Sequence, residues 1–445
     1  MKLVQFGAGN IGRSFIGQIF SRAGWEVVFV DVNEHLVKQL NEKQYYTVVI
    51  KREGQTDEVR RVGPVRAVNG QDAAAELVDA DITATSVGKN ALPKVLPIIA
   101  DGLKARYKLK SGSSVNGSTL ENPAALAAER PLDIILAEND REAPALCRSV
   151  LTAELGPKFP LDKLVGLVET SVGKMVPIMK AADLATDPLL LFAEEYEKLI
   201  VDANAFRNPL PNIPELRPVH PIAAYVDRKL FIHNLGHAAA AYLGCAALAK
   251  NETANMAALT IPEVLPNVEE TVRRVMNEAA DALVLEYPEN STKDSTSPVK
   301  YGGSYSREDV SAHIENLIFR FKNHALGDTV HRVGRDLRRK LAREDRITGA
   351  MLLCAKHGLP FGTIAAVYRA ALEFAIPAEN GALFPADEEF RKLYRLDQRP
   401  GVNNQFANAE YNSILKQILQ EVSGLDSSQT TDASVIKEIT EKCKT

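Results

Sequence analysis

The sequence of 445 residues has few cysteines, no surplus of positive charge and no long apolar run. Its four cysteines lie far apart and show no C-x-x-C spacing; they are Cys147, Cys245, Cys354 and Cys443. This pattern argues against a zinc knuckle or a disulfide framework and favours a reducing compartment. The formal net charge of -4 argues against a nucleic-acid-binding protein, which normally carries a basic surplus.

The apolar residues indicate neither a membrane segment nor a leader peptide. The run Ala238–Ala249 is about a dozen residues long, whereas a helix needs about 20 apolar residues to cross a bilayer. Met1 is followed almost at once by an apolar strand, without the charged start and longer apolar core of a signal peptide. We therefore expect a cytoplasmic protein without membrane or nucleic-acid partners, either a monomer or a small homo-oligomer.

The first part of the chain alternates short β-like runs with helical ones. Strands are expected at Leu3–Phe6, Glu26–Asp31, Tyr45–Ile50, Asp81–Thr85, Asp133–Ala137 and Leu164–Glu169. Strands that alternate with helices indicate right-handed βαβ units and a parallel sheet. The sequence therefore predicts an α/β Rossmann domain with a mostly parallel doubly wound sheet over residues 1–190.

After about Pro177 the apolar spacing becomes helical. Helices are expected at Leu189–Val201, Ile222–Lys250, Val264–Leu285, Ser311–Phe321, Val330–Arg343, Ile347–His357, Ile364–Phe374 and Ser413–Val422. The pattern predicts an all-α C-terminal domain over residues 191–445. Polar segments at 110–122, 288–306 and 399–408 are expected to be surface loops.

The segment FGAGNIGR places Gly7, Gly9 and Gly12 in a G-x-G-x-x-G pattern between a strand and a helix, with Asp31 at the end of the next strand. Glycines here permit a tight turn, close approach to a pyrophosphate and close helix–strand packing, and the helix start binds phosphates. Asp31 would accept hydrogen bonds from a ribose and repel a 2′-phosphate, which favours NAD over NADP. FAD and S-adenosylmethionine are the alternatives.

The predicted cofactor site includes the glycine segment and a second loop, TSVGKNAL, after the fourth strand of the fold. That loop supplies a hydroxyl and a glycine near the expected nicotinamide ribose, although it could be a plain strand-to-helix turn. The predicted cofactor-binding residues are Phe6, Gly7, Ala8, Gly9, Asn10, Ile11, Gly12, Asp31, Thr85, Ser86, Val87 and Gly88.

The helix within RKLFIHNLGHAAAAYLG carries three polar residues of complementary chemistry. At about 100° per residue, Asn234 and His237 lie about 140° and 80° from Lys229, on one broad face. A partly desolvated lysine can take a proton from an alcohol, an asparagine can donate to a developing alkoxide, and a histidine can orient a hydroxyl. The alternative is an ordinary polar helix face.

The spacing Lys-x4-Asn-x2-His behind a G-x-G-x-x-G domain resembles the polyol-specific long-chain dehydrogenase/reductase family. The resemblance extends through NPLPNIPEL, RVGRDLRRKLAREDR and VSGLD near the chain's tail. It implies a metal-free NAD-dependent oxidoreductase in which Lys229 is the base, Asn234 and Asn139 polarise the oxyanion, and His237 contacts a substrate hydroxyl. The implied reaction interconverts a linear polyol or polyol phosphate and its ketose, first of all D-mannitol 1-phosphate and D-fructose 6-phosphate.

The chain departs from this family near the expected substrate side. Lys174 replaces the usual arginine after the sixth strand, and the proline that usually follows RVGR is absent. In the basic segment from residue 332 to 346, Arg332, Arg335 or Arg339 could bind a phosphate, although charge runs are usually solvated helix faces. Mannitol 2-dehydrogenase and hexuronate reductase activities, with Lys174 facing a carboxylate, therefore stay open.

Two further alternatives concern a metal and a non-enzyme. His233 and His237 form an H-x3-H pair, but the zinc-protease pattern needs a glutamate where Asn234 stands, so we expect no metal site and a structural His233. A protein that merely senses NAD is disfavoured, since a sensor needs no base. The role of the added residues 379–411 stays open.

Overall fold

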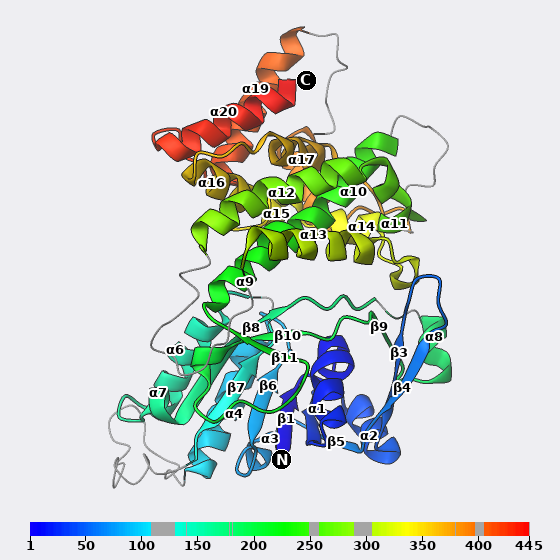
Figure 1. The fold of residues 1–445 in the computed structure, drawn as a ribbon, viewed down its shortest axis with the longest axis vertical. Helices are drawn as coiled ribbons and strands as arrows, with labels where there is room; N and C mark the ends of the chain where they lie inside the picture. The colour runs from blue at the N-terminus through cyan, green and yellow to red at the C-terminus, as the bar shows by residue number, and fades with distance from the viewer. Residues whose placement is uncertain are drawn as a thin grey trace. The chain divides into compact units, whose positions relative to one another are not determined.

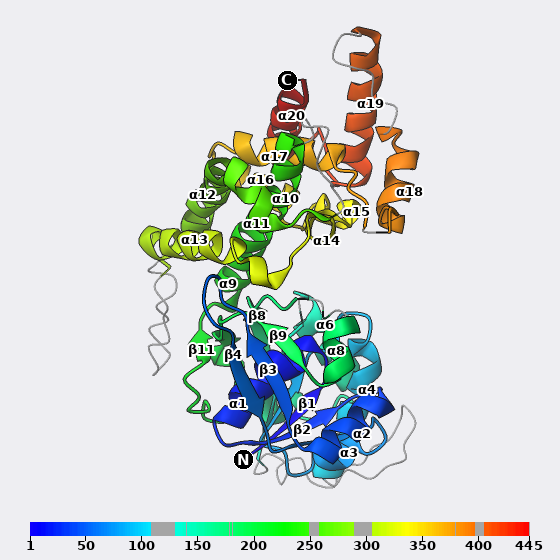
Figure 2. The same cartoon turned by 90° about the vertical axis from the view of Figure 1, so that its right-hand side faces the viewer.

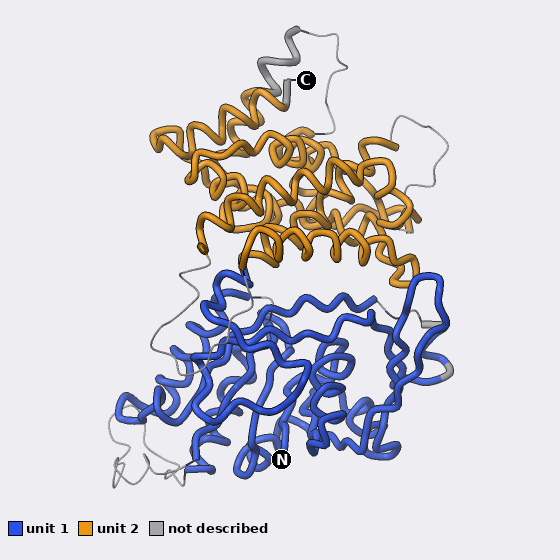
Figure 3. Tube along the Cα trace, viewed as in Figure 1, with its two compact units in different colours: residues 1–226, 298–302 blue, residues 227–297, 303–445 orange. Residues whose placement is uncertain are grey.

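The computed structural model describes residues 1–107, 130–138, 140–177, 179, 181–248, 258–288, 305–378, 380–396 and 405–444. Within the described chain, contacts define two compact units: the first covers Met1–Val226 and the second begins at Asp227 (Figure 3). The first unit extends beyond the boundary expected at residue 190, because three strands follow that point.

An eight-stranded sheet forms the centre of the first unit (Figure 1), with the order β11-β10-β8-β7-β6-β1-β2-β5. Its strands are β1 (Lys2–Phe6), β2 (Glu26–Val30), β5 (Val65–Val68), β6 (Ile82–Thr85), β7 (Leu132–Leu136), β8 (Val165–Val172), β10 (Leu199–Asp202) and β11 (Leu216–Val219). Strand β10 runs antiparallel to β8, and the other neighbouring pairs are parallel. The predicted mostly parallel Rossmann sheet is confirmed.

Helices pack on both faces of this sheet, so successive strand side chains enter different cores. Leu3 belongs to the core that contains Phe15 and Phe20, whereas Val4 belongs to the core that contains Leu96. The helical segments of the unit are the π-helical η1 (Gly12–Gly17), α1 (Gln18–Arg22), α2 (Glu34–Lys43), α3 (Ala73–Glu76), α4 (Leu92–Arg106), α6 (Ala143–Leu155), α7 (Leu161–Leu164), α8 (Ala181–Thr186) and η2 (Ala203–Ala205). The β1–η1 connection therefore has the position of a dinucleotide-binding turn.

A second, three-stranded sheet has the order β4-β3-β9 (Figure 2), with β3 at Tyr46–Ile50, β4 at Glu58–Val62 and β9 at Leu191–Ala193. The strand expected at 45–50 thus exists, but it pairs outside the main sheet. The helix expected at 189–201 is wrong, because its two apolar runs form β9 and β10. Short apolar runs do not distinguish a buried strand from a helix, and here pairing with distant strands decides the outcome.

From Asp227 onward the described elements are helices, which confirms the all-α character of the C-terminal part. Helix α9 (Ile222–Arg228) continues directly into the π-helical η3 (Lys229–Asn234) and then into α10 (Leu235–Leu248). The helices that follow are α11 (Ile261–Val264), η5 (Leu265–Asn267), α12 (Glu269–Glu286), α13 (Arg307–Phe321), η7 (His324–Leu326), α14 (Val330–Gly334), α15 (Leu337–Lys340), α16 (Thr348–Lys356), α17 (Gly362–Glu373), α18 (Pro385–Leu393), α19 (Gln405–Glu421) and α20 (Thr430–Lys444). Helix α10 packs against α11, α12, α14 and α17. It lies at the centre of the second unit, which explains why its residues 238–242 are all buried.

The helix expected at 330–343 is broken into α14 and α15. At the break, Asp336 has a φ of +73°, a left-handed conformation that ends a helix. The Asp387 carboxylate accepts hydrogen bonds from the amides of Asp336 and Leu337, at 2.8 and 2.7 Å. A side chain that is distant in sequence therefore satisfies the backbone of the break. No helix in the described part of the chain is long and apolar enough to cross a membrane.

Candidate functional site

The glycine loop between β1 and η1 has a backbone that requires glycine at two positions. Gly7 has a φ of +90°, and a Cβ there would lie 2.7 Å from the carbonyl oxygen of Ser86. A Cβ at Gly12 would lie 1.9 Å from the carbonyl oxygen of Gly7. A Cβ at Gly9 would meet no atom within 4 Å. The loop is therefore packed at Gly7 and Gly12 and open at Gly9, where it leaves room for a pyrophosphate.

Asp31 lies just beyond β2 and binds the glycine loop directly. Its Oδ2 accepts a hydrogen bond from the Ala8 amide at 2.8 Å, and its Oδ1 accepts one from the Asn33 amide at 2.9 Å. These two contacts fix the orientation of a partly exposed carboxylate beside the turn. The arrangement fits an adenosine ribose, whose hydroxyls can donate to the same carboxylate, and it places a negative charge where a 2′-phosphate would lie.

The loop after β6 is held by a carboxylate that sequence reasoning missed. Both oxygens of buried Glu138, two residues after the end of β7, accept backbone hydrogen bonds: from the Val87 amide at 3.0 Å and from the Gly88 amide at 2.7 Å. Gly88 has a φ of +83°, and a Cβ there would meet no atom within 4 Å. Glu138 therefore fixes the backbone of the turn, while the space that a side chain at residue 88 would occupy is empty. This arrangement suits close approach of a ligand to Gly88.

The other predicted cofactor residues differ in how they can contribute. The side chains of Phe6 and Thr85 are buried within their strands, so these two residues shape the site through their backbone. The Phe6 carbonyl accepts from the Ser86 amide at 2.9 Å and so joins the two loops. Asn10 is exposed and Ile11 is partly exposed at the start of the following helix.

Arg13 was also missed, although it directly follows the glycine fingerprint. It is 6% exposed, and it donates from Nε to the Ala8 carbonyl at 2.6 Å and from Nη1 to the Leu189 carbonyl at 2.9 Å. Burial lowers the pKa of the Arg13 guanidinium, and the nearby Asp31 carboxylate opposes this shift. Arg13 therefore stabilises the turn through hydrogen bonds to buried backbone, and its side chain is not exposed to a ligand.

In the second unit, Lys229 and Asn234 are the first and last residues of η3. A π-helical turn joins residues five apart, so these two lie about one turn from each other, closer to a common face than in an ordinary α-helix. Burial, together with the nearby Arg346 guanidinium, lowers the pKa of Lys229 to about 7. A lysine with this pKa is partly neutral at neutral pH and can accept a proton.

His237 lies three residues farther along, in the first turn of α10, and its ring is held on two sides. Its Nε2 is 3.0 Å from Oδ2 of Asp328. Its face stacks on the ring of Phe321, with centroids 4.9 Å apart and an interplanar angle of 12°. The imidazole therefore has a defined plane and a defined partner at Nε2, and it is suited to orient a substrate hydroxyl.

Asp328 connects His237 to one of the predicted arginines. Its other carboxylate oxygen, Oδ1, forms an ion pair with Nη1 of Arg332. Burial raises the pKa of Asp328, but the interactions with His237 and Arg332 outweigh burial, and the pKa of Asp328 is lowered. The structure thus brings Arg332 into the same cluster as His237, through a carboxylate that the sequence did not reveal.

The other predicted cations lie in different surroundings. Arg335 packs over the ring of Phe384, with Cζ 5.3 Å from the centroid. Arg339 forms ion pairs with Asp336 and Asp345, as expected of a salt-bridged helix face. Lys174 belongs to the first unit, where it is buried with Nζ 5.4 Å from the centroid of the Phe15 ring. Of Arg332, Arg335 and Arg339, it is Arg332 that shares the Asp328 carboxylate with His237.

Two residues of the predicted constellation need separate mention. Asn139 lies outside the described residues. His233 is 5% exposed, and burial, then the charge of Arg320, keeps the pKa of His233 well below its ordinary value. A buried neutral imidazole is consistent with the structural role that we expected. Among the described residues, no group of three or more His, Cys, Asp or Glu side chains could hold a metal ion.

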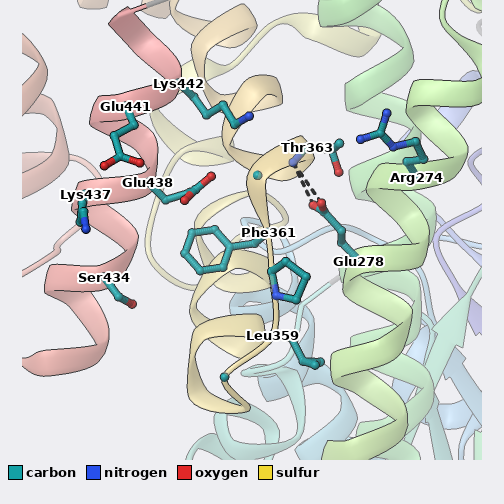
Figure 4. A pocket seen from close by; sticks show the side chains of 13 residues that line it. Arg274, Glu278, Leu359, Phe361, Thr363, Ser434, Lys437, Glu438, Glu441 and Lys442 are labelled. Carbon is teal, nitrogen blue, oxygen red and sulfur yellow. Dashed lines mark hydrogen bonds between the residues drawn. The ribbon is translucent and has the colours of Figure 1, made fainter.

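A pocket of about 670 Å³ in the second unit contains none of the predicted site residues (Figure 4). It is lined by residues of α12, of the loop into α17 and of α20, among them Glu278, Thr363 and Lys442. The Glu278 carboxylate accepts from the Thr363 amide at 3.1 Å and from the Ile364 amide at 3.0 Å. The start of α17 is therefore capped by a protein carboxylate. We therefore keep the residues Lys229, Asn234 and His237, and not this pocket, as the candidate site.

Comparison with known proteins identifies the family of the chain. The model of the mannitol dehydrogenase Rossmann domain matches residues 1–115, and that of the mannitol dehydrogenase C-terminal domain matches residues 221–444. A protein of Buchnera aphidicola subsp. Acyrthosiphon pisum (strain APS), named mannitol-1-phosphate 5-dehydrogenase, is 30% identical over 84% of this chain and 86% of its own. A protein of Arthrobacter sp. (strain FB24) with the same name is 33% identical over 86% of this chain and 88% of its own.

Among solved structures, a Pseudomonas fluorescens mannitol 2-dehydrogenase in ternary complex with NAD and D-mannitol has a TM-score of 0.62. The alignment covers 100% of this chain and 90% of that chain at 14% identity, so it shows a shared fold. The two family models match residues in both units, and the curated relatives cover most of the chain. The chain therefore belongs to the mannitol dehydrogenase family and is an NAD-dependent polyol dehydrogenase.

Proposed function

We propose that this enzyme interconverts D-mannitol 1-phosphate and D-fructose 6-phosphate, with Lys229 as the general base. The observation that carries the reaction type is the π-helical turn that joins Lys229 to Asn234, next to His237. The curated relatives at 30% and 33% identity, both named mannitol-1-phosphate 5-dehydrogenase, support this substrate pair. The Asp31 carboxylate beside the glycine loop supports NAD as the cofactor.

In this proposal each polar residue has one task. Lys229 takes the proton from the reacting hydroxyl, which it can do because its pKa is lowered to about 7 and a fraction of it is neutral. Bound NAD⁺ supplies the hydride acceptor. The amides of Asn234 and Asn139 donate to the oxygen that becomes negative, and His237 orients a neighbouring hydroxyl.

For the phosphate we propose Arg332, because it lies in the cluster that contains His237. Its guanidinium has the planar geometry that suits phosphate oxygens, and Asp328 fixes its position from Oδ1. Arg335 and Arg339 are less suited, since one packs on Phe384 and the other pairs with Asp336 and Asp345. Lys174 stays a lower-ranked candidate because it is buried over Phe15 in the first unit.

The test is a substrate screen. Purified enzyme and NADH are mixed with fructose 6-phosphate, fructose, fructuronate or tagaturonate, and the loss of NADH absorbance is followed. We expect the largest kcat/KM with fructose 6-phosphate. Turnover of fructose but not of its phosphate would reassign the enzyme as a mannitol 2-dehydrogenase, and turnover of the uronates alone would make it a hexuronate reductase. Binding of NADH without turnover of any ketose would indicate an NAD sensor.

Replacing Asp31 by asparagine is expected to reduce the preference for NADH over NADPH. Asparagine keeps an acceptor for the Ala8 amide but removes the charge that binds the ribose and repels a 2′-phosphate. A charged hydrogen bond contributes about 1.5–3 kcal/mol, so the ratio of kcat/KM values for the two cofactors should fall by about 10- to 100-fold.

The matched control is Val32→Ala, next in sequence, whose side chain is exposed and should leave the ratio unchanged. The melting temperature of both variants is measured, because Asp31 also holds the loop through Ala8. An unchanged cofactor ratio in a stable Asp31→Asn protein would remove Asp31 from the cofactor site.

A further inference from the structure

Asp328 is the buried carboxylate to which both His237 and Arg332 are bound, and the backbone around it is hydrogen-bonded to a second segment. An antiparallel bridge between Thr260 and Thr329 flanks it. The Ile261 amide donates to the Asp328 carbonyl at 2.9 Å, and the Val330 amide donates to the Leu259 carbonyl at 2.8 Å. The position of the carboxylate is therefore set by the backbone of two segments that are far apart in the sequence.

The His237 ring has little freedom to turn in this environment. The ring of Phe321 stacks on its face at 4.9 Å, and Asp328 meets its Nε2 at 3.0 Å. An ionised carboxylate only accepts hydrogen bonds, so the contact requires a proton on Nε2. In the neutral imidazole the other nitrogen, Nδ1, is then an acceptor.

The geometry points to Asp328 as a positioning residue that sets the His237 tautomer, with Nε2 protonated and Nδ1 presented as the acceptor for a polyol hydroxyl. This inference rests on the proposed function for its choice of ligand. A hydroxyl of the polyol can donate to Nδ1, whereas the opposite tautomer would present an N–H there and could not accept that proton. Asp328 thus acts on the substrate through His237 and does not touch it.

The pair with Arg332 makes an asparagine substitution unusually informative. Arg332 donates to Oδ1 and His237 donates to Oδ2, so both contacts need an acceptor. Asparagine has one oxygen and one NH₂ group. The guanidinium cannot accept a hydrogen bond, so it should take the oxygen and leave the NH₂ group facing Nε2. Asp328→Asn should therefore reverse the His237 tautomer while conserving the shape of the side chain.

The test combines a spectroscopic and a kinetic measurement on the full chain. The histidines are labelled with ¹⁵N, and the His237 signals, identified by their loss in His237→Asn, are recorded at alkaline pH. We expect an Nε2-protonated ring in the parent and an Nδ1-protonated ring in Asp328→Asn. We also expect the KM for fructose 6-phosphate to rise by about 10- to 100-fold, with a much smaller change in kcat and an unchanged KM for NADH.

The double variant Asp328→Asn with Arg332→Gln keeps the inference testable if the single variant is unstable. In the double variant no Arg332 guanidinium binds the amide oxygen of the new asparagine. This oxygen can therefore turn to Nε2 of His237, and the parent tautomer should return in a large fraction of molecules. The same tautomer in the parent and in a folded Asp328→Asn protein, or an unchanged KM for fructose 6-phosphate in a variant whose tautomer has reversed, would overturn the inference. If the parent turns over no ketose, the proposed function fails, whereas the ¹⁵N spectra still decide whether Asp328 sets the tautomer.

Discussion

Replacing Lys229 by alanine is expected to lower kcat for polyol oxidation by about 10²- to 10⁴-fold, the range that a positioned general base contributes. Without Lys229, the reacting hydroxyl has to lose its proton to water. NAD binding should change little, because Lys229 is not among the residues that we expect to bind NAD. The measurement is steady-state oxidation of D-mannitol 1-phosphate, together with NAD affinity by fluorescence.

The pH dependence of the parent enzyme provides a second measurement of the same lysine. Burial lowers the pKa of Lys229 to about 7, and a base must be unprotonated, so the oxidation rate should rise as the pH increases through about 7 and then level off. An unperturbed lysine, with a pKa near 10.5, would make the rate rise only in strongly alkaline solution. In Lys229→Ala the rise near pH 7 should disappear.

Lys229→Arg separates the charge of the residue from its ability to accept a proton. Arginine stays protonated at any working pH, so this variant should be about as inactive as alanine although it is cationic. Lys356→Ala is the matched control, because Lys356 is an exposed residue of the same unit that pairs with Glu286. Near-normal activity of Lys229→Ala at neutral pH would show that another group is the base.

The glycine-rich turn could be predicted from the sequence because its signals are local. The spacing of Gly7, Gly9 and Gly12 and the acidic residue after the second strand lie within a single βαβ unit. The structure adds what the spacing cannot contain. Gly12 faces the carbonyl of Gly7 at a distance that excludes any side chain, and Glu138 fixes the distant Gly88 turn. Such contacts join segments that are separated in sequence, so no local pattern reveals them.

The helix that contains the proposed catalytic residues Lys229 and Asn234 was also predicted only in part. Its residue types could be identified from the sequence, but the wheel of an ordinary α-helix separates Lys229 and Asn234 by about 140°. The π-helical turn reduces that separation, and nothing in the residue pattern predicts it. Asp328 was missed for another reason: it lies in a loop far along the chain, where a lone aspartate is unremarkable until the fold places it against His237.

The strands after residue 190 were missed because their apolar runs are only three or four residues long. The run in β9 pairs with β3, and the run in β10 pairs with β8 and β11. Strand β11 contains Pro218 and lies at the edge of the main sheet, where a residue without an N–H is tolerated. Tertiary pairing therefore outweighed the helical spacing that the sequence alone suggested.

Replacing Gly12 by alanine is expected to weaken cofactor binding by about 100-fold and to destabilise the first unit. The new Cβ would lie 1.9 Å from the Gly7 carbonyl oxygen and 3.0 Å from Oγ of Ser86. Because the nearest of these atoms belongs to the backbone, the turn itself must move. Overpacking of this kind costs about 1–3 kcal/mol of folding free energy. A displacement of about 1 Å at a binding loop can reduce affinity or rate by about 100-fold.

Gly9→Ala is the matched variant, since it adds the same methyl group to the same loop. A Cβ at Gly9 would meet no protein atom within 4 Å, so the melting temperature should equal that of the parent. NAD binding should nevertheless weaken by about 10-fold or more, because the methyl group occupies the space in which the pyrophosphate approaches the backbone. Titration with NADH and thermal unfolding of both variants separate the two effects. If Gly9→Ala bound NADH as tightly as the parent, the open side of the turn would not be the pyrophosphate site. If Gly12→Ala kept both the stability and the NADH affinity of the parent, the close contact with Gly7 would not fix the turn.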